Sequence, residues 1–203
     1  MDIFILDGEG NARSAGVDSR FRVKAAALVE TESNYATTRE LKFNINTGDI
    51  ELAAAKTTVL YFKNNELNNV IVDLLVYNLG NSTGGSGDVL IDVIRNPTAG
   101  DIITNANDCP IGTGIEANLN YYSNRVLECL AYKGASGETP VTDGLEQILT
   151  RSPNLSGRLP ISPGGGLLLG RGNSLAVNYT PPSGNTSQFC QFALNVYVKE
   201  ETK

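Results

Sequence analysis

The sequence contains no histidine and no tryptophan, and only three cysteines occur among its 203 residues. Without histidine, every hydrolase that uses a histidine base is excluded, and so are the usual zinc sites with histidine ligands. Cys109, Cys129 and Cys190 are widely spaced and form no CxxC pair, so we interpret them as buried, small apolar side chains. We therefore expect a protein that is not an enzyme and that has no metal and no cofactor.

Charge and hydrophobic runs exclude two further classes of partner. The 16 Lys and Arg against 22 Asp and Glu give a net charge of -6, and the basic residues are scattered rather than clustered. Phosphate binding depends on clustered cations, so nucleic acid is not expected as a partner. Residues 1–10 carry acids on both sides of a short apolar stretch, unlike a signal peptide, and a membrane span needs about 20 apolar residues. We expect a protein made and used in solution.

Apolar and polar residues alternate with a period of two in many short segments, which is typical of strands with one buried face. The clearest segment is 187–199. The apolar positions that share one face of an expected strand are Phe21, Val23 and Ala25; Leu41, Phe43 and Ile45; Leu60 and Phe62; Val89, Ile91 and Val93; Leu127, Cys129 and Ala131; Leu175, Val177 and Tyr179; and Cys190, Phe192, Leu194, Val196 and Val198.

Turn-forming residues separate these segments, and the best helical segment is the short stretch 144–150. We predict an all-β fold of residues 11–203: a single two-sheet antiparallel β-sandwich, jelly-roll-like, with about ten strands. We find no metal-binding or catalytic motif in the turns between the predicted strands.

The segment 69–78 is apolar on both faces of an expected strand. An unpaired ionised Asp costs several kcal/mol in a dry core, which exceeds the roughly 1.5 to 3 kcal/mol gained by burying one apolar neighbour. The face of Asp73 should therefore be the outer one, and it would display Ile71, Leu75 and Tyr77. Such an exposed row predicts a subunit interface, with cover by one of the protein's own loops as the alternative.

The first ten residues are a second candidate for partner contacts. The apolar stretch is separated from the rest of the chain by Gly8 and Gly10. Residues 1–10 are thus a candidate arm that adds a strand to a neighbour's sheet edge, with Ile3, Phe4 and Ile5 filling pockets there. Pairing within its own sheet is the alternative.

Signals for chemistry are weak. The carboxylate pairs Asp88 with Asp92 and Glu138 with Asp143 are better explained as solvated surface charge than as a glycosidase pair. The acidic and amide residues of 101–108 do not follow the spacing of a calcium loop.

Tyr121, Tyr122 and Tyr132 could form an aromatic platform for a sugar, but packing in the core or at an interface suits tyrosine better. The lack of tryptophan weakens the sugar platform further.

Three longer phrases and one short one resemble a known group of proteins. Residues 80–100 end a strand in Asn-Pro-Thr, residues 124–134 join an Asn-Arg segment to a Tyr-Lys-Gly turn, and residues 174–198 contain a Pro-Pro-x-Gly-Asn-Thr-Ser hairpin. Together with residues 17–23, these patterns are similar to virion structural proteins of tailed bacteriophages. The similarity covers most of the chain and consists of strand and turn patterns without a catalytic signature.

The resemblance implies a capsid decoration (cement) protein on the outside of the virion, made in the host cytoplasm. Its partners would be the major capsid protein or other virion subunits, and it would form a homo-oligomer, a dimer or trimer, without nucleic acid or membrane. A tail-associated or fibre-associated module that binds a receptor or glycan is the alternative.

Overall fold

The structure, a computed structural model, describes residues 4–6, 12–14, 16–17, 23–24, 32–153, 157–161 and 166–200. It divides the chain into two compact units, Met1–Thr31 and Glu32–Lys203. The first unit contains two antiparallel strand pairs, β1 (Phe4–Leu6) with β2 (Ala12–Ser14) and β3 (Gly16–Val17) with β4 (Val23–Lys24).

The expected arm of residues 1–10 contains β1, whose partner strand lies in the same unit. Phe4 and Ile5 lie opposite Ser14 and Arg13 in that pair, and Ile3 is outside the described residues. Addition of the arm to a neighbour's sheet edge stays a prediction, as does a domain that begins at residue 11.

Most of the regular elements of the second unit are strands. Its elements in chain order are α1 (Glu32–Thr38), β5 (Lys42–Asn46), β6 (Ile50–Leu52), β7 (Thr57–Asn64), β8 (Val70–Leu79), β9 (Asp88–Arg95), α2 (Asp101–Thr104), β10 (Asn107–Asp108), the 3-10 helix η1 (Ile115–Ala117), β11 (Cys129–Lys133), β12 (Leu145–Pro153), β13 (Gly157–Ile161), β14 (Leu167–Leu169), β15 (Ser174–Thr180) and β16 (Gln188–Val198). Among the described residues, no helix is long and apolar enough to cross a membrane.

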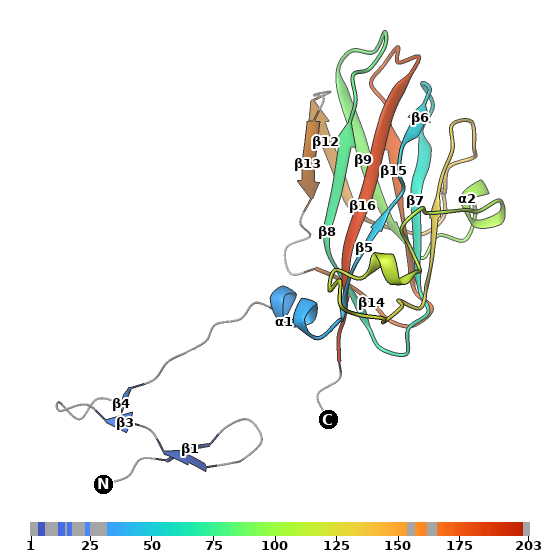
Figure 1. Ribbon diagram of the computed structural model, residues 1–203. Coiled ribbons are helices and arrows are strands. Elements are labelled where there is room, and N and C mark those ends of the chain that lie inside the picture. The colour runs from blue at the N-terminus through green and yellow to red at the C-terminus, as the bar shows by residue number, and fades with distance from the viewer. Residues whose placement is uncertain are drawn as a thin grey trace. The chain divides into compact units, whose positions relative to one another are not determined.

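These strands form two antiparallel sheets that face each other (Figure 1). The first sheet has the order β10-β11-β7-β15-β9-β12. The second has the order β13-β8-β16-β5, with β14 also paired with β8 and β6 also paired with β16. Successive strands cross between the sheets: β7 and β9 belong to the first sheet, whereas β8 belongs to the second. The prediction of an all-β, two-sheet antiparallel sandwich of jelly-roll type is confirmed.

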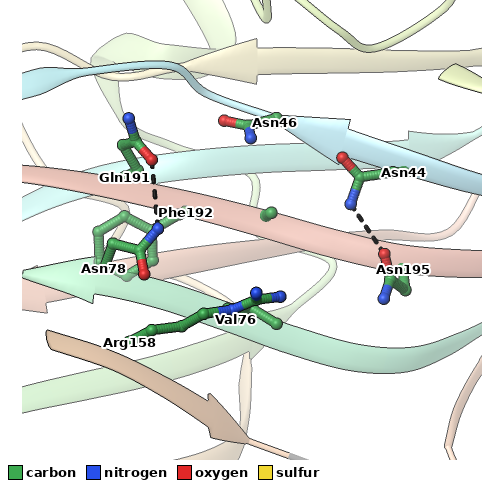
Figure 2. Close-up of a pocket in the computed structure, with 9 residues that line it drawn as sticks. Asn44, Asn46, Val76, Asn78, Arg158, Gln191, Phe192 and Asn195 are labelled. Atoms are coloured by element: carbon green, nitrogen blue, oxygen red, sulfur yellow. Dashed lines mark hydrogen bonds between the residues drawn. The ribbon is translucent and has the colours of Figure 1, made fainter. Parts of the chain in front are cut away.

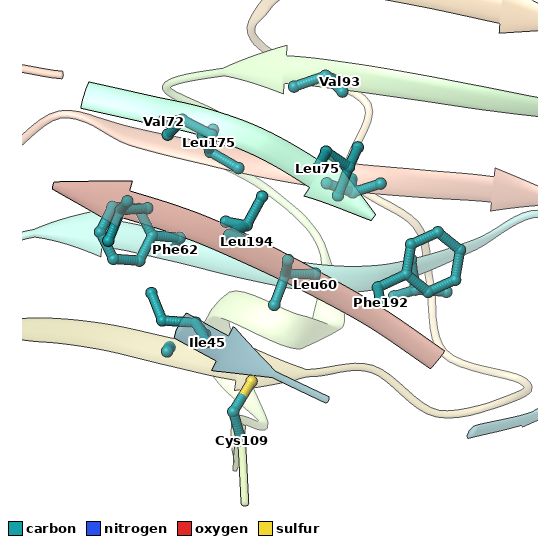
Figure 3. Packing of buried hydrophobic residues seen from close by; sticks show 14 of the residues in the cluster. Ile45, Leu60, Phe62, Val72, Leu75, Val93, Cys109, Leu175, Phe192 and Leu194 are labelled. Atoms are coloured by element: carbon teal, nitrogen blue, oxygen red, sulfur yellow. The ribbon is translucent and has the colours of Figure 1, made fainter. Parts of the chain in front are cut away.

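The core lies between the sheets, and Figure 3 shows its side chains interdigitating. Every period-two segment predicted between residues 41 and 198 places its apolar face there. Phe192 is at the centre, because its ring stacks on Tyr77 at 6.0 Å and meets the edge of Tyr179 at 5.8 Å. The buried Tyr179 hydroxyl donates a hydrogen bond to Gln188 Oε1 at 2.7 Å, so this hydroxyl is paired inside the core.

A β-bulge at Asp73 changes which face of β8 is buried. The register of β8 against β16 shifts between Asn195, opposite Leu74, and Val196, opposite Val72. One residue of β8, Asp73, is therefore left between them without a counterpart. A bulge of this kind reverses the alternation of side chains along the strand.

The expected exposed row on β8 is wrong for this reason. Asp73 does lie toward solvent, with its side chain 39% exposed and bonded to Lys42 Nζ at 3.2 Å. Beyond the bulge, however, Leu75 and Tyr77 point into the core and are buried. Ile71 is also buried, because Gly166 passes so close that an added Cβ would lie 2.5 Å from the Ile71 side chain. None of these three apolar side chains is available at the surface.

The stretch 144–150 was expected to be the best helical segment, and it is a strand instead. Residues from Leu145 onward form β12, which pairs with β9 and shifts register between Glu146 and Ile148. Two turns of isolated helix are marginal, whereas this strand gains a continuous ladder of backbone hydrogen bonds along β9. The pairing that decides the outcome is with a segment about 50 residues away along the chain.

The outer face of the first sheet is covered by the chain itself. A second apolar cluster lies there, below α2 and the segment that precedes β12, and consists of Tyr61, Ile94, Ile102, Val141 and Ala176. Its edge is closed by Tyr132, whose ring stacks on Tyr61 at 5.9 Å.

The same covered face also buries polar side chains. Thr58 Oγ1 donates to Asn178 Oδ1 at 2.5 Å and accepts from the Val141 backbone N–H at 2.8 Å. Asn178 Nδ2 in turn donates to the Val141 carbonyl at 3.2 Å. These bonds fix the covering segment on the sheet. Asp92 is buried nearby and forms an ion pair with Lys56.

Candidate docking surface

The outer face of the second sheet differs because much of it is open, although Gly166 covers Ile71 at one end. In β5 the polar residues Lys42, Asn44 and Asn46 alternate with buried apolar residues, and in β16 Gln191 and Asn195 do the same. Since the apolar partners fill the core, strand geometry forces these polar side chains onto the opposite face. The result is a surface dominated by uncharged amides, which we call the amide face.

The amide face contains a groove of about 250 Å³ that runs across four strands (Figure 2). Asn44 and Asn46 come from β5, Gln191 and Asn195 from β16, Val76 and Asn78 from β8, and Arg158 from β13, with Phe192 and Ala193 completing the lining. Figure 2 shows Arg158 reaching from β13 over β8.

The amides of the groove are held in place by bonds between neighbouring strands. Asn44 Nδ2 donates to Asn195 Oδ1 at 2.8 Å, and Asn78 Nδ2 donates to Gln191 Oε1 at 3.2 Å. Gln191 Nε2 donates to Asp49 Oδ1 at 2.7 Å. A side-chain amide has two donor hydrogens and two acceptor lone pairs, so these bonds orient each group and leave part of its capacity for a ligand.

The groove suits binding rather than bond-making. Arg158 is the one charged side chain among the described residues that line it. Side-chain amides do not ionise near neutral pH, so the described residues that line the groove include no carboxylate, imidazole or thiol to act as a general acid or base. It can donate and accept hydrogen bonds to a protein backbone or to hydroxyl groups.

A second exposed feature is the loop that follows η1. Tyr121 and Tyr122 are 90% and 98% exposed. The loop itself is fixed by Asn118, whose Nδ2 donates to the Glu40 carbonyl at 3.0 Å and whose Oδ1 accepts from the Asn120 N–H at 2.8 Å. The two rings are therefore displayed on an anchored loop.

The three tyrosines named as a possible platform do not come together. Tyr132 belongs to β11 and packs on Tyr61 at the covered face, whereas Tyr121 and Tyr122 lie on the loop after η1. Only the latter two are available to a partner.

The cysteines are buried, as predicted, and burial changes their chemistry. Removal from solvent raises the pKa of the Cys109, Cys129 and Cys190 thiols from 9.0 to about 12. The thiolate, which is the nucleophilic form, is therefore scarce at neutral pH. The described residues contain no group of three or more His, Cys, Asp or Glu side chains placed to hold a metal ion.

Two of the acidic candidates accept hydrogen bonds from backbone N–H groups. Asp101 Oδ2 accepts from the Thr139 N–H at 2.7 Å and so joins α2 to the segment before β12, whereas Glu138 Oε2 accepts from the Ala135 N–H at 2.9 Å within a turn. Asp88 is exposed, as expected for surface charge. That expectation is wrong for Asp92, whose side chain is 5% exposed and paired with Lys56, because α2 and its flanking segments cover this part of the sheet.

Comparison with known proteins gives only weak matches. No protein-family model matches the sequence, and no curated protein matches it. Among solved structures, a chain of deformed wing virus, a honeybee pathogen, has 9% identity and a TM-score of 0.29 over 98% of this chain and 55% of its own. A chain of sacbrood virus of honeybee has 12% identity and a TM-score of 0.24 over 81% of this chain and 74% of its own.

This protein thus spans about half the length of the deformed wing virus chain. At such identities and TM-scores, the likeness to these virus chains assigns no role to any residue.

Reasoning from the sequence missed the groove, although a signal for it exists. Asn44, Asn46, Asn78, Gln191 and Asn195 occupy the polar positions of three predicted strands. Their common amide chemistry is visible in the sequence, but their assembly into one surface depends on β8 and β5 flanking β16.

Proposed function

We propose that this protein is a structural component of a tailed-bacteriophage particle, and within the particle a capsid decoration protein that binds the assembled head. Its partners are the major capsid protein or other virion subunits, and it acts as a small homo-oligomer on the outer surface. The observation that carries the proposal is the amide face, an open sheet surface with oriented hydrogen-bonding groups and no reactive centre.

The chemistry of that face supports contact with another protein. Oriented amides can pair with the backbone groups and polar side chains of a partner, and Arg158 adds one strong donor for a carboxylate or carbonyl. Tyr121 and Tyr122 add exposed aromatic area, which is the type of side chain enriched in the energetically important part of interfaces. The resemblance of the strand and turn phrases to phage virion proteins supports the particle context.

Decoration needs no catalysis because it works by mass action. A protein that binds only the assembled shell adds its binding free energy to the stability of that state. A two-layer sandwich suits this task, since it holds the docking surface rigid and loses little conformational entropy on binding.

The experiment is a binding measurement on particles. Purified protein is mixed with heads that lack it, the heads are sedimented, and the bound fraction is measured together with the temperature at which the heads release their DNA. We expect saturable binding and a higher release temperature. Particles that bind none of the protein, or a reconstruction that places this chain away from the head, would refute decoration.

A pair of variants locates the contact. Asn44→Asp with Asn195→Asp places two negative charges in the amide face, whereas Arg151→Gln changes an exposed residue of β12 on the other sheet. We expect the first variant to bind heads at least about tenfold more weakly, because unpaired charges must be desolvated, and the second to bind normally.

A glycan-binding module on a tail or fibre is the second candidate, and the groove itself favours it. The side-chain amides and the Arg158 guanidinium that line the groove can also form hydrogen bonds with the hydroxyl groups of a sugar. A glycan array distinguishes the two functions: saturable binding of a defined sugar that is lost in the Asn44→Asp, Asn195→Asp variant, together with labelling at a single vertex, would replace decoration by adhesion.

A further inference from the structure

Arg95 occupies an unusual place at the end of β9. The row Val89, Ile91 and Val93 on the same strand points into the core, and Arg95 continues that row by two residues. Leu175, which lies opposite Arg95 on β15, is also a core residue. The arginine side chain is therefore directed toward the space between the two sheets, at one end of the sandwich.

A small pocket of about 170 Å³ surrounds this side chain. Arg95 and Leu175 belong to the first sheet, whereas Leu167, Leu168 and Leu169 belong to β14 on the second sheet, and Gly166 completes the lining. Leu168 is 53% exposed, so the pocket combines apolar walls with access from solvent.

The charge of Arg95 is not compensated in the described part of the chain. Its Nε atom is buried and has no hydrogen-bond partner, and no ion pair joins its guanidinium to a described carboxylate. This is notable in a protein with a net charge of -6. A buried donor without a partner is unfavourable in the free protein and becomes favourable when an acceptor arrives.

We propose that this pocket binds a carboxylate next to an aliphatic side chain, supplied by an acidic residue of the particle subunit on which the protein docks; this rests on the proposed function. The guanidinium offers two parallel N–H donors, which match the two oxygens of a carboxylate. The leucines accept the aliphatic neighbour. A phosphate group fits less well, because a single cation among leucines leaves most of its charge and oxygens without partners.

Short peptides test the recognition directly. The probe is the capped dipeptide acetyl-Glu-Leu-amide, and the matched control is acetyl-Gln-Leu-amide, which has the same shape without the charge. Two-dimensional NMR of the isotope-labelled full chain should show saturable shifts at Arg95 and Leu168 with the first peptide and none with the second. Equal shifts with both peptides, or no shifts with either, would overturn the proposal.

A variant separates binding from a structural role of the arginine. Arg95→Met keeps an unbranched, flexible side chain and removes the guanidinium with its charge. It should abolish the peptide-dependent shifts while the melting temperature stays the same or rises, because an unpaired buried donor has been removed. Arg151→Gln removes an exposed arginine and should leave the shifts unchanged. Shifts that persist in Arg95→Met would refute the site.

Binding of the Arg95→Met protein to heads shows whether the carboxylate belongs to the subunit on which the protein docks. Arg95→Met should bind heads at least about tenfold more weakly than the unchanged protein. Equal head binding would contradict the partner assignment while leaving decoration intact. Failure of the unchanged protein to bind heads, with the peptide result standing, would instead refute decoration and leave the carboxylate pocket in place.

Discussion

The two sheets of this protein have opposite outer faces. The first sheet is covered by α2 and its flanking segments, which bury a second apolar cluster and a set of bonded polar groups against it. The second sheet presents a row of amides to solvent. The first face therefore contributes to stability in the manner of a core, whereas the second contributes little to stability and is free to bind.

Removal of an apolar side chain from the covered face should have the largest effect on the free energy of unfolding. Ile102 is 1% exposed and packs in the cluster on the outer side of the first sheet. Ile102→Ala should lower the free energy of unfolding by about 3 kcal/mol, since it deletes buried methyl groups and leaves a cavity. Urea denaturation measures this, with the solvent-exposed Leu67→Ala as the control. A cost below that of the control would mean that α2 does not cover the sheet.

High pH should lower the stability of the protein through the buried thiols of the interior rather than through groups on either outer face. Burial raises the pKa of Cys109, Cys129 and Cys190 to about 12, so the unfolded chain loses thiol protons near pH 9 while the folded chain keeps them. Stability should be constant up to about pH 8 and then fall by roughly 1 kcal/mol for each thiol per pH unit.

Urea denaturation at pH 8 and pH 10 checks this expectation. A variant with all three cysteines changed to alanine should start lower but lose much less between these pH values. The same decline in that variant would show that the thiols are not responsible.

Loss of the buried hydrogen bonds of the covered face should lower the free energy of unfolding by an intermediate amount. Thr58→Val keeps the shape of the side chain but leaves the Val141 N–H and the Asn178 amide without their partner. We expect a loss of about 2 kcal/mol in the free energy of unfolding, because both groups stay buried. Hydrogen exchange of the Val141 amide gives an independent measurement, and unchanged protection there would contradict the assigned bond.

A similar change on the amide face should have the smallest effect on stability. Asn195→Ala removes the acceptor of the Asn44 bond, which is only partly buried in the open groove of the amide face. Water replaces the lost partner, so the free energy of unfolding should change by less than about 1 kcal/mol. Urea denaturation of Asn195→Ala and Thr58→Val under the same conditions tests the comparison. An equal loss in the free energy of unfolding for both variants would contradict the difference between the two faces.

The regular strands could be predicted from the sequence because burial repeats at every second residue. Cys190, Phe192 and Leu194 of β16 are a clear example, and all three lie in the core. The bulge at Asp73 could not be predicted, because it results from pairing with β16, more than 100 residues away along the chain. Because Asp73 has no counterpart on β16, the alternation along β8 reverses, and Leu75 and Tyr77 lie in the interior instead of at the expected surface.

The docking surface was harder to predict than the strands, for two physical reasons. Asn and Gln at polar positions of a strand are ordinary, so each amide alone carries no signal; the arrangement of β5, β16 and β8 turns five of them into one groove. Arg95 likewise looks in the sequence like a charged residue at a strand end. Its place among leucines depends on β14, which the alternation pattern did not reveal.

The position of the last two strands has a consequence for how the protein is made. β15 lies between β7 and β9 in the first sheet, and β16 lies between β8 and β5 in the second. The first sheet thus lacks an inner strand until β15 has been made, and the second until β16 has been made, so neither sheet can form completely before this last part of the sandwich is available. A nascent chain halted before β15 should stay sensitive to protease along its whole length.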